Sequence, residues 1–226
     1  MTNSSNLIDS LEVFVLSNPK EVKPHWVSHF TVPTANELLI KIKNKDGNSG
    51  FGLATSYTDI KPIIKPFSNG LQDLIIGEDP FCPERIYEKI FKLTDTRQSN
   101  EKGWSREALI RISAALDIAC WDLIGKASKI PLYKLFGGFR NKIPVYVTCA
   151  YYRDGKDEKE LRKELQKLIK IGHQSFKVKV GGLSIKEDAK RLEIIRQEIG
   201  DDKDLMIDVN RAWDLKTAIE GVKEFE

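Results

Sequence analysis

Apolar and polar residues alternate in three segments near the N-terminus, a pattern typical of strands that bury one face. We predict strands at Leu11–Ser17, Glu37–Lys43 and Gly50–Tyr57. An Asp-Gly dipeptide between the last two favours a tight hairpin turn, so the segments predict a small antiparallel sheet. The long connection between the first two strands carries His25–Phe30, rich in aromatic residues and histidine, as in many functional loops.

Helical periodicity follows the alternating segments. We predict a helix from Pro83 to Leu93 and a longer one over Arg106–Lys126, with Ser105 as its N-cap. A Gly-Gly pair ending at Gly138 then interrupts the pattern, and we place a domain boundary there.

Beyond Gly138, short strands alternate with amphipathic helices. The strands are predicted at Ile143–Cys149, Ser175–Val180 and Leu205–Asn210. The helices that follow them are predicted at Asp157–Gly172, Ser184–Ile199 and Asp214–Glu226. This succession predicts parallel strands joined by helical crossovers, in either a barrel or an open sheet.

Four polar residues interrupt the apolar pattern of two of these strands. Residues i and i+2 of a strand share a face, so Lys177 and Lys179 point one way. Asp208 and Asn210 repeat the pattern on the next strand. All four lie at the carboxyl ends of their strands, where α/β barrels build active sites.

These residue types predict a specific chemistry. Neighbouring ammonium groups disfavour each other's charge, which predicts a lowered pKa for one or both lysines and so a general base. A carboxylate on the neighbouring strand can bind a hard cation. Such a cation stabilises the enediolate that forms when a proton next to the carboxylate of a substrate is removed. Two other interpretations stay open: K-x-K is often a solvated strand face, and D-x-N is often a helix-capping loop.

Composition narrows the class of protein. The 226 residues are 41% hydrophobic and 31% charged, and the net charge is +3. The lysines and arginines are spread along the chain and form no basic cluster. We therefore expect no nucleic-acid partner. The three cysteines lack metal-site or disulfide spacing, which favours a reducing, cytoplasmic location. No segment resembles a signal peptide or a membrane span, so we expect no membrane partner.

The segment Ala114–Gly138, AALDIACWDLIGKASKIPLYKLFGG, resembles the signature of the mandelate racemase/muconate lactonizing enzyme group of the enolase superfamily. The later motifs FKVKVGG and MIDVN are similar to that group's lysine and first metal-ligand motifs, in the expected order. The resemblance implies an α/β protein. Residues 1–138 would form an α+β capping domain with a three-stranded antiparallel sheet, and residues 139–226 the first three βα units of a modified TIM-type barrel.

The resemblance also implies a Mg²⁺-dependent enzyme that removes the proton α to the carboxylate of a small substrate. Lys179 would be the base, and Lys177 would help hold the substrate carboxylate. Asp208 would be the first Mg²⁺ ligand, and Asn210 would lie beside the substrate. Three residues of the capping loops would also contact the substrate: His25, Trp26 and Tyr57.

A complete barrel takes about 200–250 residues, so we expect this chain to be a fragment that is inactive alone. The resemblance implies that the remaining metal ligands and the second acid/base are missing, and we expect the complete protein to be a homo-oligomer. Tyr151 and Tyr152 lie in the first βα loop, which is similar to that loop in some hydroxy-acid dehydratases. This favours dehydration of a hydroxy acid or acid sugar, with packing at the barrel rim as the other interpretation of the tyrosines. The alternatives are a racemase, epimerase or cycloisomerase of the same group, and a catalytically inactive fragment or subunit.

Overall fold

The chain divides into two compact units. The computed structural model describes residues 6–17, 24–32, 36–56 and 59–226. One unit comprises Met1–Pro19 and Thr34–Asn141, and the other comprises Lys20–Pro33 and Lys142–Glu226. The predicted division at Gly138 placed His25–Phe30 in the first domain, whereas the structure assigns these residues to the second unit. Among the described residues, no helix combines the length and apolar character needed to cross a membrane.

The first unit contains the predicted antiparallel sheet. Its strands are β1 (Ile8–Ser17), β4 (Asn36–Asn44) and β5 (Ser49–Ser56), in the order β1-β4-β5. Both pairings are antiparallel, and β1 begins earlier than the sequence pattern predicted. The apolar residues that alternate along β4 are fully buried: Leu38, Ile40 and Ile42.

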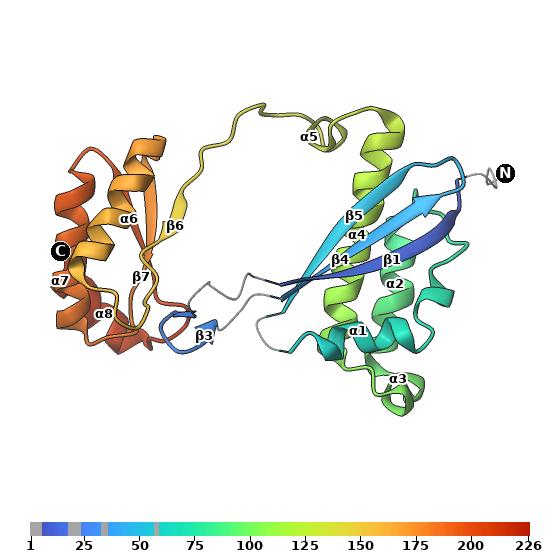
Figure 1. Cartoon of the computed structure of the whole chain (residues 1–226), viewed down its shortest axis with the longest axis horizontal. Helices are drawn as coiled ribbons and strands as arrows, with labels where there is room; N and C mark the ends of the chain where they lie inside the picture. Colours follow the sequence, from blue (N-terminus) through green and yellow to red (C-terminus); the bar gives the residue numbers. More distant parts are fainter. Residues whose placement is uncertain (1–5, 18–23, 33–35, 57–58) are drawn as a thin grey trace. The chain divides into compact units, whose positions relative to one another are not determined.

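Helix α4 (Arg106–Ser128) lies across one face of this sheet (Figure 1). The approach is close because β5 presents glycines to it. A Cβ on Gly50 would lie 1.9 Å from the carbonyl oxygen of Ala119, and one on Gly52 would lie 1.8 Å from that of Ala115. Any side chain at these positions would push the helix off the sheet.

Shorter helices complete the first unit. They are α1 (Lys61–Ser68), α2 (Pro83–Phe91), α3 (Arg97–Lys102) and α5 (Leu132–Leu135), with 3-10 turns at Gln72–Leu74 and Lys92–Asp95. Ile86 and Ile90 of α2 join Leu109 and Ile112 of α4 in the same buried core. The N-cap predicted for α4 is confirmed, because Ser105 Oγ accepts a hydrogen bond from the Ala108 N–H at 3.1 Å.

The second unit contains the predicted βα units. Strands β6 (Val147–Cys149), β7 (Ser175–Lys179) and β8 (Asp204–Asp208) form a parallel sheet in that order. Helices α6 (Glu158–Ile171), α7 (Ile185–Ile199) and α8 (Leu215–Phe225) follow the three strands in turn (Figure 1). A hairpin of β2 (His25–Trp26) and β3 (Thr31–Val32) belongs to the same unit.

Several strand limits and one helix face in this unit differ from the prediction. The first strand was expected from Ile143, but that side chain is 74% exposed and pairing starts only at Val147. The third strand was expected to reach Asn210, whose φ of 46° takes the chain out of the extended conformation. The apolar stripe predicted on α8 is largely exposed, as at Leu215.

Tight contact between β5 and α4 gives a test of the first unit. Gly52→Ala places a methyl group against the backbone of Ala115, so the free energy of unfolding should fall by about 3 kcal/mol. The control is Leu53→Ala on the exposed face of the same strand, which should cost less than about 1 kcal/mol. Urea denaturation followed by circular dichroism measures both. Equal effects of the two substitutions would contradict this description of the interface.

Candidate active site

Strand β7 separates an apolar face from a charged one. Phe176 and Val178 are fully buried in the core shared with α6 and α7. Lys177 and Lys179 point to the opposite face, as the alternation predicted. Lys179 is only 6% exposed. The interpretation of Lys179 as part of a solvated strand face is therefore wrong.

The neighbouring strand supplies the charge that partners these lysines. Lys179 pairs in register with Asp208 at the carboxyl ends of β7 and β8. The Lys179 Nζ lies 2.8 Å from Asp208 Oδ2, and the Lys177 Nζ lies 3.5 Å from the same oxygen. One carboxylate thus lies within ion-pair distance of both ammonium groups.

The expectation that lysine repulsion dominates is wrong for Lys177. Its Nζ donates a hydrogen bond to the Tyr146 hydroxyl at 3.3 Å, and this contact, together with Asp208, raises the pKa of Lys177. The hydrogen bond from Lys179 lowers the pKa of Asp208, with smaller contributions from the Asn210 N–H and Lys177. The cluster therefore keeps Lys177 protonated and Asp208 ionised at neutral pH.

A left-handed turn directly after β8 places Asn210 beside Asp208. The Asn210 N–H donates to Asp208 Oδ1 at 3.0 Å. Among the described residues, the buried Asn210 Oδ1 has no hydrogen-bond partner. The interpretation of D-x-N as a helix cap is wrong, because Asp214 caps α8 by accepting from the Thr217 N–H at 2.8 Å.

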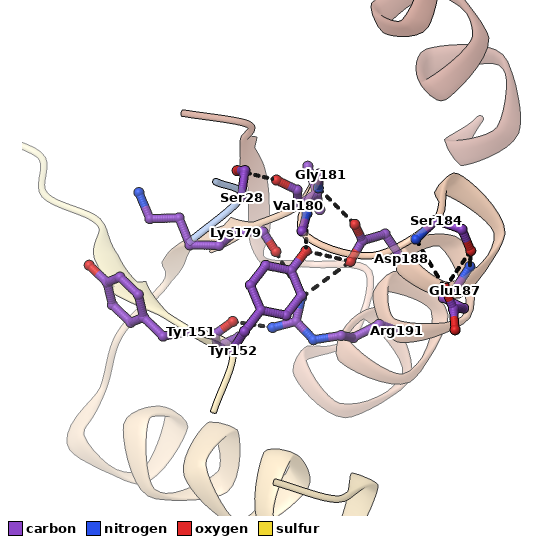
Figure 2. Close-up of polar contacts among 12 residues, drawn as sticks. Ser28, Tyr151, Tyr152, Lys179, Val180, Gly181, Ser184, Glu187, Asp188 and Arg191 are labelled. Atoms are coloured by element: carbon purple, nitrogen blue, oxygen red, sulfur yellow. Dashed lines mark hydrogen bonds and ion pairs between the residues drawn. The ribbon is translucent and has the colours of Figure 1, made fainter. Parts of the chain in front are cut away.

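Tyr151 lies on the lysine side of the sheet. Its ring centre is 5.6 Å from the Lys179 Nζ, and the His25 ring meets it edge-on at 4.7 Å. Partial burial lowers the pKa of His25, which favours the neutral imidazole. Lys179 and Tyr151 extend to the same side in Figure 2. The Tyr151 ring thus contacts both His25 of the hairpin and Lys179 of β7.

Tyr152 and Trp26 lie apart from this group. Tyr152 is buried, and its hydroxyl donates to Asp188 Oδ1 at 2.6 Å (Figure 2). The Trp26 ring stacks on it with centroids 4.3 Å apart. Burial and the bond to Asp188 raise the pKa of Tyr152, so its hydroxyl stays protonated. These contacts match the packing interpretation for Tyr152, while Tyr57 lies outside the described residues.

Three residues at or behind the site were not singled out from the sequence. Tyr146 directly precedes β6 and lay within the strand predicted from Ile143, where its hydroxyl was not considered. Asp188 and Arg191 lie on an amphipathic helix, where charged residues are normally solvated, yet Asp188 is fully buried. Their i, i+3 spacing was the only available signal.

The fit to Mg²⁺ rests on Asp208. A hard dication prefers oxygen ligands, and Asp208 offers an ionised carboxylate where the strands end. The described part of the chain contains no group of three or more His, Cys, Asp or Glu residues that could hold a metal ion. Asp208 therefore fits as one oxygen ligand of such a cation.

Comparison with known families agrees with the fold and the motifs. The profile of the mandelate racemase/muconate lactonizing enzyme N-terminal domain matches residues 10–137. That of enolase C-terminal domain-like proteins matches residues 160–226. The chain belongs to the mandelate racemase/muconate lactonizing enzyme group of the enolase superfamily. The resemblance in its sequence motifs is thus confirmed, as is the predicted fold class of a capping domain followed by part of a barrel.

Curated relatives in this group differ in their reactions. The chain is 33% identical to L-Ala-D/L-Glu epimerase of Clostridium acetobutylicum over 225 residues, covering 97% of this chain and 58% of the relative. It is 32% identical to arabinonate dehydratase of Saccharolobus solfataricus over 189 residues, covering 84% of this chain and 49% of the relative. The chain thus spans about half the length of the curated relatives it matches.

Solved structures of the superfamily share the fold. A racemase from Streptomyces coelicolor A3(2) with bound magnesium superposes with a TM-score of 0.82 at 26% identity, covering 96% of this chain and 59% of that one. A mutant L-talarate/galactarate dehydratase liganded with Mg and L-glucarate gives 0.80 at 26% identity, covering 95% and 54%. Magnesium is thus found in structures of similar proteins.

The Asp208 carboxylate makes stability depend on pH. Its pKa is lower in the folded protein than in the unfolded chain, so its contribution is complete above about pH 4 and is lost as the pH falls through the folded pKa. The difference in unfolding free energy between wild type and Asp208→Asn, measured in EDTA, should therefore shrink on acidification.

The matched control is Glu12→Gln, which removes an exposed ion pair with Lys41. Such pairs contribute at most about 1 kcal/mol. Urea titrations from about pH 6 down through the ordinary aspartate pKa near pH 4, and below it, follow the loss of this contribution. A wild-type advantage over Asp208→Asn that stays constant across this range would refute the assigned ion pair.

Proposed function

We propose that the complete protein removes the proton α to the carboxylate of a small hydroxy acid or acid sugar and then eliminates water, with Mg²⁺ as cofactor. The observation that best supports this proposal is the position of Lys179. Its side chain is almost fully buried at the end of β7, and its Nζ lies 2.8 Å from Asp208 on the adjoining strand. A buried lysine at the carboxyl end of a barrel strand is the arrangement expected of a catalytic base.

Each step can be assigned to atoms. The Lys179 Nζ, once it has lost its own proton, takes the proton from Cα, and the electron pair of the C–H bond moves into the carboxylate to form an enediolate. That pair then returns to form the Cα–Cβ double bond as the Cβ–O bond breaks, so that the hydroxide released and the proton taken by Lys179 add up to one molecule of water. The enol product takes up a proton at the β-carbon to give a 2-keto acid. Lys177, whose pKa is raised, stays cationic and attracts the substrate carboxylate.

When bound, Mg²⁺ would supply positive charge opposite the negative charge that develops on the substrate carboxylate. Asp208 would hold it through a carboxylate oxygen. The amide oxygen of Asn210, which has no hydrogen-bond partner among the described residues, would accept from a substrate hydroxyl. Tyr151 and His25 would contact the substrate from the loop and hairpin beside Lys179. Trp26 and Tyr57 stay predicted members of the substrate-binding region, whereas the hydroxyl of Tyr152, predicted with them, is bonded to Asp188.

Two observations favour a hydroxylated substrate. The groups around Lys179 are polar or aromatic with a polar atom, namely Tyr146, Tyr151 and His25. Hydrogen-bonding groups suit a substrate that carries several hydroxyls. Relatives named arabinonate dehydratase and L-talarate/galactarate dehydratase support the same choice.

A second candidate is racemisation or epimerisation. It shares the first step, and the carbanion is then reprotonated on the other face. It is favoured by the similarity to L-Ala-D/L-Glu epimerase, which extends over 97% of this chain. Cycloisomerisation is a further alternative, with a D-galactarolactone cycloisomerase among the relatives.

A substrate screen of the complete protein with Mg²⁺ in deuterated water separates these reactions. Hydroxy acids, acid sugars and dipeptides form the panel. Appearance of a 2-keto acid marks dehydration, and deuterium at Cα without keto acid marks racemisation. We expect a 2-keto acid from at least one acid sugar, and Lys179→Ala should lower kcat at least about 100-fold by removing the base.

The matched control for the lysine is Lys203→Ala. Lys203 is also poorly exposed and paired with an aspartate, but it precedes β8 at the other end of the sheet. Its replacement should leave kcat within about twofold. Full activity of Lys179→Ala would show that the base is assigned wrongly. Exchange at Cα without keto acid across the panel would replace dehydration by the second candidate.

A further inference from the structure

Behind the lysine strand lies a carboxylate that the proposed chemistry does not use. Asp188, near the start of α7, is fully buried. Its Oδ1 accepts from the Tyr152 hydroxyl at 2.6 Å, and its Oδ2 accepts from the Gly181 N–H at 2.7 Å (Figure 2). Arg191 lies 3.6 Å away as its counter-charge. Burying a charged pair is costly, so this one calls for a function or a structural reason.

Arg191 connects Asp188 to the ends of two strands. Its guanidinium donates to the carbonyl oxygen of Lys179 at 2.7 Å and to that of Ala150, which directly follows β6. It also lies over the Tyr152 ring, 4.3 Å from the centroid. A planar guanidinium can bridge two carbonyls in fixed directions, which a lysine ammonium cannot do. Arg191 therefore fixes the backbone of the proposed base itself.

The same network holds the hairpin that carries His25. The backbones of Trp26 and Tyr152 exchange two hydrogen bonds, at 2.9 and 3.2 Å. Their rings are stacked, and the Ser28 Oγ donates to the carbonyl oxygen of Val180 at 2.7 Å. The hairpin is thus attached to the segments that follow β6 and β7. Both Lys179 and His25 depend on one buried cluster.

We propose that Asp188, Arg191 and Tyr152 are positioning residues: together they fix the Lys179 backbone and attach the His25 hairpin to the same strand ends. The inference rests on the proposed function, because it takes Lys179 as the base. None of the three needs to touch the substrate. Catalytic groups must be held within about 0.5 Å of the productive geometry, and misplacement of about 1 Å can cost about 100-fold in rate.

Helix α7 offers a matched control in Arg196. This residue also donates to two backbone carbonyls, those of Gly200 at 2.9 Å and Lys203 at 2.8 Å. Those carbonyls lie before β8, at the end of the sheet away from Lys179. Arg191 and Arg196 thus make the same kind of bond from one helix to opposite ends of the strands.

The first measurement is steady-state kinetics of the complete protein on the substrate found in the screen. Arg191→Ala should lower kcat about 100-fold because the base is displaced, and it should raise KM by less than about tenfold because the hairpin that carries His25 is loosened as well. Arg191→Lys should stay deficient, since it cannot bridge both carbonyls. Arg196→Ala should keep kcat within about twofold even where it loses as much stability. Equal kcat values for the two alanine variants would overturn the proposal.

The second measurement needs no activity. Amide hydrogen exchange of this chain should be faster at Trp26, Gly181 and Gly182 in Tyr152→Phe and Arg191→Ala, and unchanged there in Arg196→Ala. Tyr152→Phe keeps the ring stacked on Trp26 and removes only the hydroxyl. Unaltered protection in Tyr152→Phe and Arg191→Ala would overturn the network. The proposed function fails separately, if Lys179→Ala is fully active while the exchange pattern is as expected.

Discussion

The parallel register of β7 and β8 is the constraint on which the proposed chemistry depends. It sets Lys179 opposite Asp208 at the ends of adjacent strands, so that Nζ and Oδ2 lie 2.8 Å apart. In parallel strands a shift by one residue would turn either side chain to the apolar face. Phe176 and Val178 are completely buried, and this burial opposes the shift. A shift by one residue would expose these two side chains and bury the lysines against α6 and α7. The core thus holds the charged face in place.

Around this pair the second unit has two polar layers with different roles. On the open side, Tyr146, Tyr151 and His25 lie near the lysines and leave groups that could meet a substrate. On the inner side, Asp188 and Arg191 bond to the backbone at the strand ends. In the proposed function, charge on the first layer serves binding and proton transfer. Charge on the second layer is compensated internally, and we propose that it serves to position the strand ends.

Much of this arrangement could be predicted from the sequence, because period-two alternation fixes which residues share a strand face. This alternation correctly placed Lys177 and Lys179 on one face. The succession of alternating and amphipathic segments correctly gave the order of the three βα units. The sequence pattern could not show that Asp208 would outweigh the repulsion between the lysines, since that depends on distances across strands. It also missed Asp188 and Arg191, because helix periodicity does not reveal which charged residues are buried. The end of the third strand was misplaced because the left-handed conformation of Asn210 leaves no pattern in the apolar residues.

The central claim is that Lys179 and Asp208 interact directly as a poorly exposed ion pair at the strand ends. A double-mutant cycle with Lys179→Met and Asp208→Asn, followed by urea denaturation in EDTA at neutral pH, tests it most directly. Residues in contact show coupling energies of about 0.5–3 kcal/mol, and we predict a value of about 1–2 kcal/mol in favour of the wild-type pair. Additive effects of the two substitutions, within about 0.3 kcal/mol, would contradict the claim.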